Sequence, residues 1–236
     1  MKSLLGNLRR TIQENDMIKD GDRVAVGLSG GKDSMVLLYA LKKFQRFSPI
    51  KYELAAATIN LGFDNFDLTK TKEFCELLEV PLFIEETNIA KIVFEAREEK
   101  NPCALCANMR RGALMTLLNK EGYNVLALGH HSDDAIETMF MNMFYTGKLS
   151  TLDYKAFLSR SEVSVIRPFM NVKEADIIGA VNKEGIPVTK SPCPMDKNTT
   201  REKIKNLLKG IYSDIPNSRQ SIVKSMKNEE QFKLWF

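Results

Sequence analysis

Val24-Ala25-Val26-Gly27-Leu28-Ser29-Gly30-Gly31-Lys32-Asp33-Ser34 is the stretch that decides the fold of this chain. Its apolar start, Val24 to Leu28, runs into two adjacent glycines, and a periodic apolar stretch from Met35 to Phe44 follows. This order predicts a strand, a tight loop and a helix. Glycines let the backbone approach an anion closely, and the N–H groups at a helix start point toward it. We therefore expect Ser29 to Ser34, called the phosphate loop below, to hold phosphate.

The phosphate loop differs from the Walker A loop, G-x-x-x-x-G-K-[ST], at two positions. Gly31 and Lys32 would form its Gly-Lys pair, but Asp33 stands where Ser or Thr is required and Val26 where the first glycine is required. A carboxylate after the lysine repels polyphosphate unless Mg²⁺ lies between them. Asp33 therefore predicts metal-bridged pyrophosphate. The alternative is a glycine-rich turn in which Ser and Asp only cap the helix.

Apolar strands and amphipathic helices alternate along the rest of the chain. This alternation, with strands too continuously apolar for a one-sided sheet, predicts an α/β fold with a doubly wound parallel sheet. We expect residues 22–195 to form this domain, 1–21 an N-terminal helix, and 196–236 a basic helical C-terminal extension. The expected strands are 23–28, 52–60, 82–86, 124–128 and 163–167, and the expected helices are 4–18, 34–47, 68–78, 89–99, 105–121, 133–145 and 173–183.

Composition and charge limit the classes of function. The chain has 236 residues, 44% of them hydrophobic, which is enough for a sizeable core. No apolar run approaches the roughly 18 residues of a membrane span, so we expect a cytoplasmic protein without membrane contact. The net charge is +4, and the residues from Asp196 onward carry nine Lys and Arg against five Asp and Glu. This segment is either a nucleic-acid footprint or a solvated helix face.

The four cysteines are too few for a disulfide scaffold. Cys103 and Cys106 form a C-x-x-C pair at the start of a predicted helix, a spacing shared by zinc sites, dithiols and iron–sulfur sites. Cys193 lies between two prolines, where a packing role is hard to find, so we interpret it as a ligand or a reactive thiol. Cys75 falls on the apolar stripe of a predicted helix and reads as a core residue.

Gly129-His130-His131-Ser132-Asp133-Asp134 follows another predicted strand and begins a helix. Ser132 or Asp133 can cap that helix. The same edge of a parallel sheet carries the phosphate loop, because ligands bind where parallel strands end. We therefore also interpret Asp133 as a residue that helps to hold Mg²⁺ or a nucleotide. The roles of His130 and His131 stay open.

Taken in order, these motifs resemble the tRNA 2-thiocytidine synthetases (TtcA), a group of PP-loop ATP pyrophosphatases related to the tRNA 2-thiouridine synthetases (TtuA). The resemblance runs from Asp22 to Cys193. After Lys148 the chain departs from the family, whose Met-Pro-Pro stretch is replaced here. The resemblance rests on five motifs: S-G-G-x-D-S at Ser29, C-x-x-C-x-x-x-R-R-G at Cys103, L-G-H-H-x-D-D at Leu128, I-R-P at Ile166, and Pro192-Cys193.

The resemblance implies a fold of the PP-loop ATP pyrophosphatase type and an ATP-dependent sulfurtransferase. Such enzymes adenylate a tRNA pyrimidine carbonyl, release pyrophosphate, and replace the oxygen by sulfur. It implies a [4Fe–4S] cluster on Cys103, Cys106 and Cys193, which leaves one iron without a protein ligand. It further implies catalytic roles, with Mg²⁺, for Asp33, Arg110 and Asp133, and ATP binding at Leu28, Ser29, Gly30, Gly31, Lys32, Asp33, Ser34, Ile59 and Gly129.

The implied partners are tRNA and a sulfur donor, such as a cysteine desulfurase or free sulfide, and a homodimer is a further expectation. Two alternatives remain at this point. One is the same adenylation or sulfur chemistry on a small-molecule acceptor. The other is a protein without catalysis that binds an iron–sulfur cluster or a nucleotide and attaches to RNA through its basic C-terminal segment.

Overall fold

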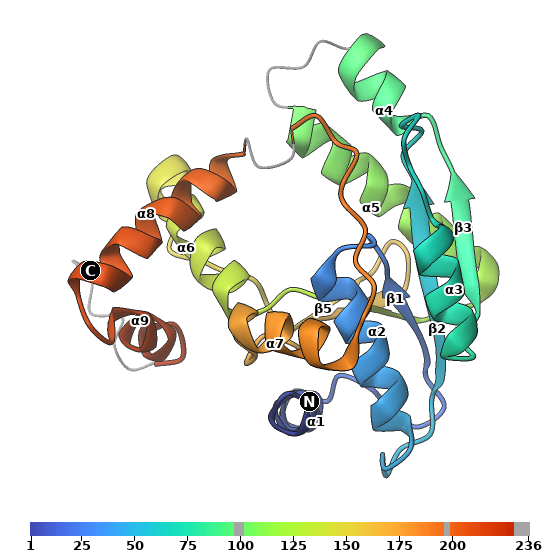
Figure 1. The fold of residues 1–236 in the computed structure, drawn as a ribbon, viewed down its shortest axis with the longest axis horizontal. Coiled ribbons are helices and arrows are strands. Elements are labelled where there is room, and N and C mark those ends of the chain that lie inside the picture. The colour runs from blue at the N-terminus through green and yellow to red at the C-terminus, as the bar shows by residue number, and fades with distance from the viewer. Residues whose placement is uncertain (97–101, 196–198, 229–236) are drawn as a thin grey trace. The chain divides into compact units, whose positions relative to one another are not determined.

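The computed structural model describes residues 1–96, 102–195 and 199–228, which include one mixed sheet of six strands (Figure 1). The strand order is β3-β2-β1-β4-β6-β5, and all neighbours are parallel except β5, which runs antiparallel to β6. The strands are β1 (Arg23–Gly27), β2 (Glu53–Asn60), β3 (Leu82–Glu86), β4 (Val125–Ala127), β5 (Lys155–Leu158) and β6 (Val163–Ile166).

The five strands expected from the sequence are confirmed, and β5 was missed. β5 has only four residues, and it lies at the edge of the sheet beside β6. Its large apolar residue, Phe157, is 63% exposed. A short edge strand with an exposed aromatic carries neither a continuous apolar run nor a clear alternation, so periodicity does not identify it.

The helices agree closely with the sequence-based expectation. They are α1 (Lys2–Glu14), α2 (Lys32–Gln45), α3 (Thr69–Leu77), α4 (Ile89–Lys91), η1 (Ile92–Ala96), α5 (Pro102–Glu121), α6 (Ser132–Thr146), α7 (Glu174–Glu184), α8 (Thr200–Asp214) and α9 (Ser218–Met226). The helix expected over 89–99 is instead a short α-helix that continues as the π-helical turn η1. The last residues of that expected helix lie outside the described residues.

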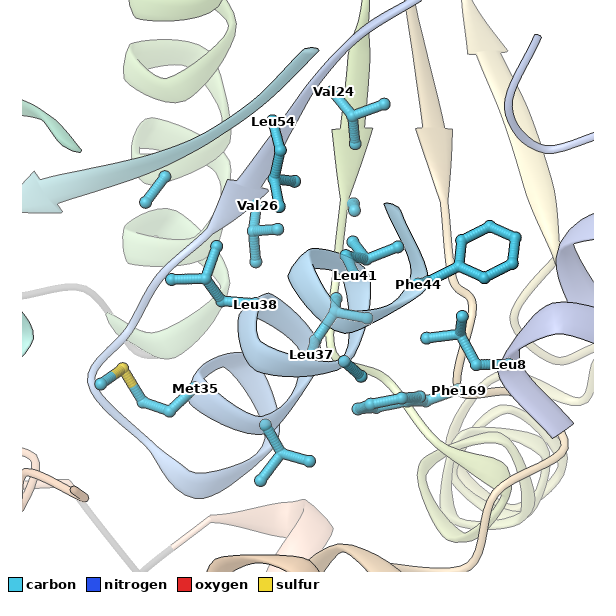
Figure 2. Packing of buried hydrophobic residues seen from close by; sticks show 14 of the residues in the cluster. Leu8, Val24, Val26, Met35, Leu37, Leu38, Leu41, Phe44, Leu54 and Phe169 are labelled. Atoms are coloured by element: carbon cyan, nitrogen blue, oxygen red, sulfur yellow. The ribbon is translucent and has the colours of Figure 1, made fainter. Parts of the chain in front are cut away.

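Both faces of the sheet are covered, as the apolar strands predicted. Side chains of Val24 and Val26 on β1 lie on one face, where α2 and α1 pack with Phe169 (Figure 2). The intervening Ala25 lies on the other face, with apolar side chains of α5. This alternation follows from the two-residue period of a strand, and it yields two cores separated by the sheet. The doubly wound α/β fold is confirmed.

The strand order fixes the site. β1 lies between β2 and β4, so the chain winds toward β3 on one side of β1 and toward β6 on the other. In such sheets a crevice opens at the carboxyl ends of the two strands where the winding reverses, which here are β1 and β4. The phosphate loop follows β1, and Gly129-His130-His131 follows β4.

The chain divides into two compact units. Unit 1 contains residues 1–131 and 153–196, with the whole sheet, and unit 2 contains residues 132–152 and 197–236. In unit 2 the helices α6, α8 and α9 share a small apolar core around Ile136, Ile204 and Leu208. No pattern along the chain indicated that α6 groups with the C-terminal helices, and the division at residues 21 and 195 stays a prediction. Among the described helices, none has the length and apolar character needed to cross a lipid bilayer.

Candidate functional site

The phosphate loop is held in shape by its own serines. Ser34, at the start of α2, is buried, and its hydroxyl donates to the carbonyl of Gly31 (3.0 Å) and accepts from the backbone N–H of Ser29 (3.2 Å). Gly30 has φ +75°, a conformation that costs glycine little. These bonds leave the loop wrapped around the N-terminus of α2, where unpaired backbone N–H groups favour an anion.

Gly129 brings the end of β4 against this loop. A Cβ on Gly129 would lie 2.8 Å from the carbonyl carbon of Asp33 and 3.0 Å from the backbone nitrogen of Ser34, so no larger residue fits without a shift. The two motifs that the sequence placed at strand ends therefore meet. Gly129 acts here through close backbone packing, a reason that its motif alone does not reveal.

Charged side chains gather at the start of α2. The Lys32 ammonium lies 3.0 Å from both the Asp33 and the Glu174 carboxylates, and Glu174 is contributed by α7. Burial alone would lower the pKa of Lys32, but Asp33 and Glu174 together outweigh it and raise that pKa. Lys32 is therefore a firmly protonated cation within the phosphate loop, as binding of a polyphosphate requires.

Asp33 has a second oxygen suited to a cation. Its Oδ2 contacts Lys32, whereas its Oδ1 is shielded from solvent and has no hydrogen-bond partner among the described residues. The Nε2 atom of the buried His131 lies 3.6 Å from that Oδ1. A shielded carboxylate oxygen of this kind fits a hard cation such as Mg²⁺, which binds through oxygen ligands and bridges to phosphate.

Leu28 directly follows β1, and Ile59 belongs to the neighbouring strand β2. The backbone N–H of Leu28 donates to the carbonyl of Ala57, and the Thr58 hydroxyl donates to the carbonyl of Leu28, both at 2.8 Å. Ile59 is buried near the end of β2. These hydrogen bonds hold together the ends of β1 and β2, where we expect the adenine to bind. The adenine site itself stays a prediction.

The predicted cysteine ligands come from two segments of unit 1. Cys103 and Cys106 occupy the first turns of α5, and Cys193 follows α7. Burial raises the pKa of the Cys106 thiol, Arg110 acts in the opposite direction, and the charges of Cys193 and Cys103 raise it further. The Cys106 thiol therefore interacts electrostatically with the other two cysteines and with Arg110.

The fourth cysteine is separate from this group. Cys75 is 1% exposed inside α3 and belongs to the core around α2. Burial raises the pKa of its thiol to about 11. Its assignment as a core residue is confirmed.

A [4Fe–4S] cluster suits the chemistry of the remaining three thiols, because thiolates are its ordinary ligands. Among the described residues, no three His, Cys, Asp or Glu side chains are grouped so as to hold a metal ion. Cys103, Cys106 and Cys193 therefore stay a predicted ligand set.

Asp133, in unit 2, has a partner that the sequence did not indicate. The Arg219 guanidinium of α9 contacts both Asp133 oxygens, with Nε to Oδ1 at 2.8 Å and Nη2 to Oδ2 at 2.9 Å. The same Nη2 donates to the Ser132 hydroxyl at 2.6 Å. Both ionic side chains are about four-fifths buried. Arg219 and Asp133 are 86 positions apart, so no local sequence pattern could have indicated this pair.

Arg201, which belongs to the basic C-terminal segment, is paired in the same unit. Its guanidinium contacts the Asp134 carboxylate at 3.0 Å and the Thr138 hydroxyl at 3.2 Å, and it lies 4.0 Å from Glu137. This arginine therefore fastens α8 to α6. An excess of positive charge along the sequence does not distinguish such an internal partner from a cation that faces solvent.

Most of the chain is similar to known proteins. Residues 4–210 match the model of the PP-loop domain family. A tRNA-cytidine(32) 2-sulfurtransferase of Pelobacter propionicus is 36% identical over 222 residues, covering 93% of this chain and 82% of that protein. The enzyme of the same name from Geobacter sulfurreducens is 34% identical over 230 residues, covering 96% of this chain and 90% of its own.

A solved structure gives a similar result. The U34-tRNA thiolase NcsA from Methanococcus maripaludis, determined with its [4Fe–4S] cluster, superposes with a TM-score of 0.76 at 25% identity. The match covers 96% of this chain and 77% of that one.

Proposed function

The chain belongs to the PP-loop family and to the group of tRNA-cytidine(32) 2-sulfurtransferases, and from this premise we propose that it is an ATP-dependent tRNA sulfurtransferase. The observation that carries the proposal is the phosphate loop, in which one shielded oxygen of Asp33, beside the N-terminus of α2, has no hydrogen-bond partner among the described residues. Such a loop suits a metal-bridged nucleotide and has no evident use in a module that binds RNA alone.

In the first half-reaction, the loop orients ATP for transfer of its adenylyl group. The phosphates are neutralised by backbone N–H groups at the start of α2 and by the Lys32 ammonium. The Asp33 carboxylate would bind the Mg²⁺ ion that accompanies ATP. The carbonyl oxygen of the pyrimidine attacks the α-phosphorus, the bond to the bridging oxygen breaks, and pyrophosphate leaves. The base oxygen is then part of a phosphate ester, so it can depart with AMP. Arg110 and Asp133 are the further residues that we propose for this chemistry.

In the second half-reaction, sulfur replaces the activated oxygen. Cys103, Cys106 and Cys193 are the proposed ligands of the [4Fe–4S] cluster, which supplies an iron with an open position for sulfide when it is bound. Arg110, one turn after Cys106 on α5, offers positive charge to the departing AMP phosphate.

The acceptor and the partners follow from the same premise. The relatives' names support a cytidine in tRNA as the acceptor. We further propose that the protein works in the cytoplasm, receives sulfur from a cysteine desulfurase or free sulfide, and forms a homodimer.

The products of ATP turnover test the first half-reaction. The protein is purified without oxygen, its iron and acid-labile sulfide are quantified, and it is incubated with Mg·ATP, sulfide and bulk tRNA. We expect AMP and pyrophosphate in equal amounts, formed only with tRNA present, and a thiolated cytidine in digested tRNA. ADP and phosphate as products would exclude adenylation, and AMP formation without any tRNA would move the acceptor to a small molecule.

Single cysteine variants test the cluster. Cys103→Ala, Cys106→Ala and Cys193→Ala should each lose the iron–sulfur absorption band and tRNA thiolation. Cys75→Ala is the matched control, because its side chain is buried in the core around α2, and it should keep both. Loss of the band in Cys75→Ala, at unchanged folded content, would contradict the three-cysteine assignment.

A further inference from the structure

One segment of unit 1 passes the phosphate loop on its way to the third predicted cysteine ligand. We call residues 186–193 the strap; Figure 1 shows this part of the chain leaving α7 and running toward the start of α5. Midway along it, the backbone N–H of Thr189 donates to the carbonyl of Gly30 at 2.9 Å. The Thr189 Cβ lies 3.2 Å from where a Cβ on Gly30 would stand. The strap therefore rests directly on the glycine of the loop.

Two shielded hydroxyls lie beside this glycine. The Oγ1 atoms of Thr189 and of Thr71, on α3, lie 3.5 and 3.8 Å from the same Cβ position on Gly30. Both atoms are shielded from solvent and neither has a hydrogen-bond partner within the described residues, and Thr71 as a whole is 0% exposed. Native proteins rarely leave buried hydroxyls in this condition, because the lost bonds to water are not replaced. Two donors without acceptors beside an anion-binding loop call for an acceptor that enters with a ligand.

The far end of the strap carries Cys193. It lies four positions after Thr189, and its charge acts on Cys106 of α5. Prolines at 187, 192 and 194 each fix a backbone dihedral, and the Cys193 N–H is bonded to the Ser191 hydroxyl at 3.2 Å. A segment restrained in this way transmits a displacement along its length more faithfully than a glycine-rich linker would.

We propose that Thr71 and Thr189 donate hydrogen bonds to a phosphate oxygen of bound ATP, and that the strap thereby couples nucleotide binding to the position of Cys193. This proposal rests on the proposed function. Both hydroxyls are shielded from solvent next to Gly30, so a phosphate oxygen would reach them as the strap moves off Gly30. That movement shifts Cys193 relative to Cys103 and Cys106. By linkage, if bound ATP changes the affinity with which Cys193 takes a ligand, that ligand changes the affinity for ATP by the same factor.

The affinity for a nucleotide tests the first part. Thr189→Val and Thr71→Val remove a hydroxyl at nearly constant shape, and binding of α,β-methylene-ATP with Mg²⁺ to the full chain is measured by calorimetry. We expect each variant to bind about 10- to 100-fold more weakly, the usual effect of losing one hydrogen bond to a charged acceptor. Thr116→Val, on an exposed position of α5, is the control and should bind as the wild type does. Unchanged affinity in both test variants would overturn the proposal.

The reactivity of Cys193 tests the coupling. The full chain, reduced and depleted of iron, is alkylated with iodoacetamide, and the rate at each cysteine is followed by mass spectrometry. We expect saturating α,β-methylene-ATP to change the ratio of the Cys193 rate to the rate of the exposed Cys103 at least threefold in the wild type and not in Thr189→Val. The buried Cys75 reports any global unfolding.

The outcomes separate the two proposals. A wild type that binds the analogue while its Cys193 ratio stays constant overturns the coupling and leaves the proposed function intact. The same holds if Thr189→Val responds as the wild type does. A folded wild type that binds no nucleotide at all overturns both.

Discussion

Asp33 in unit 1 and Asp133 in unit 2 are both aspartates in the first turn of a helix that follows a parallel strand, yet their surroundings differ. Asp33 gives one oxygen to Lys32 and keeps a shielded oxygen that accepts no hydrogen bond within the described part of the chain. Asp133 gives both oxygens to one guanidinium. A carboxylate with an unused shielded oxygen is prepared for a cation, whereas one held on both oxygens by arginine is already neutralised. The comparison ranks Asp33 as the stronger candidate for a metal ligand.

Replacement of Asp33 should have the largest effect. Asp33→Asn removes the charge that we propose to hold Mg²⁺, so we expect AMP formation to fall by a factor of about 100 or more. The free energy of unfolding should change by no more than about 0.5 kcal/mol, because the side chain lies partly open at the loop. Asp64→Asn, at an exposed position, is the control and should leave both quantities unchanged. Full activity of Asp33→Asn in a Mg²⁺ titration would show that Asp33 is not the Mg²⁺ ligand.

Removal of Arg219 should convert Asp133 into a partly buried carboxylate without its main partner. For Arg219→Ala we expect the free energy of unfolding to fall by about 1–3 kcal/mol, measured by urea denaturation. Arg219→Lys keeps the charge but not the planar fork that reaches both oxygens, so an intermediate loss is expected. If Arg219→Ala unfolds at the wild-type urea concentration, the pair is not a structural fastening.

Solvent-facing lysines of α8 should behave unlike the paired arginines. Lys203 and Lys209 are exposed, so the double reversal Lys203→Glu with Lys209→Glu should weaken tRNA binding by roughly tenfold or more and flatten its salt dependence. The affinity for ATP should not change. Lys183→Glu, exposed on α7, serves as the matched control. Binding of tRNA that is independent of salt concentration would exclude this segment as a phosphate-binding surface.

Arg201 should give the smallest change. Its guanidinium is 38% exposed, so screening reduces the worth of its contact with Asp134. We expect Arg201→Gln to lower the free energy of unfolding by about 0.5–1 kcal/mol in thermal denaturation, with tRNA affinity close to that of the wild type. A large loss of tRNA affinity without loss of stability would instead return Arg201 to the class of RNA-binding cations.

The sequence predicted those features that depend on neighbours along the chain. Two glycines after an apolar run identified the loop, because the backbone conformation there requires them, and the phase of apolar residues located the strands and helices of the sheet domain. The same reasoning placed Cys75 in the core. It missed β5, whose pairing with β6 decides its conformation, and it overestimated the regularity of the helix after β3.

By itself, then, the sequence determined the α/β fold, the phosphate loop with its lysine and aspartate, and the cysteines available as ligands. Each of these follows from the spacing of residues that are close together in the chain. Only the tertiary structure decided which groups meet. It places His131 and Glu174 at the start of α2, packs Thr189 against Gly30, and pairs Asp133 with Arg219. Such contacts join residues far apart in the chain, and they depend on strand order and helix packing. No pattern of nearby residues records them, because the free energy that selects them comes from burying distant segments together.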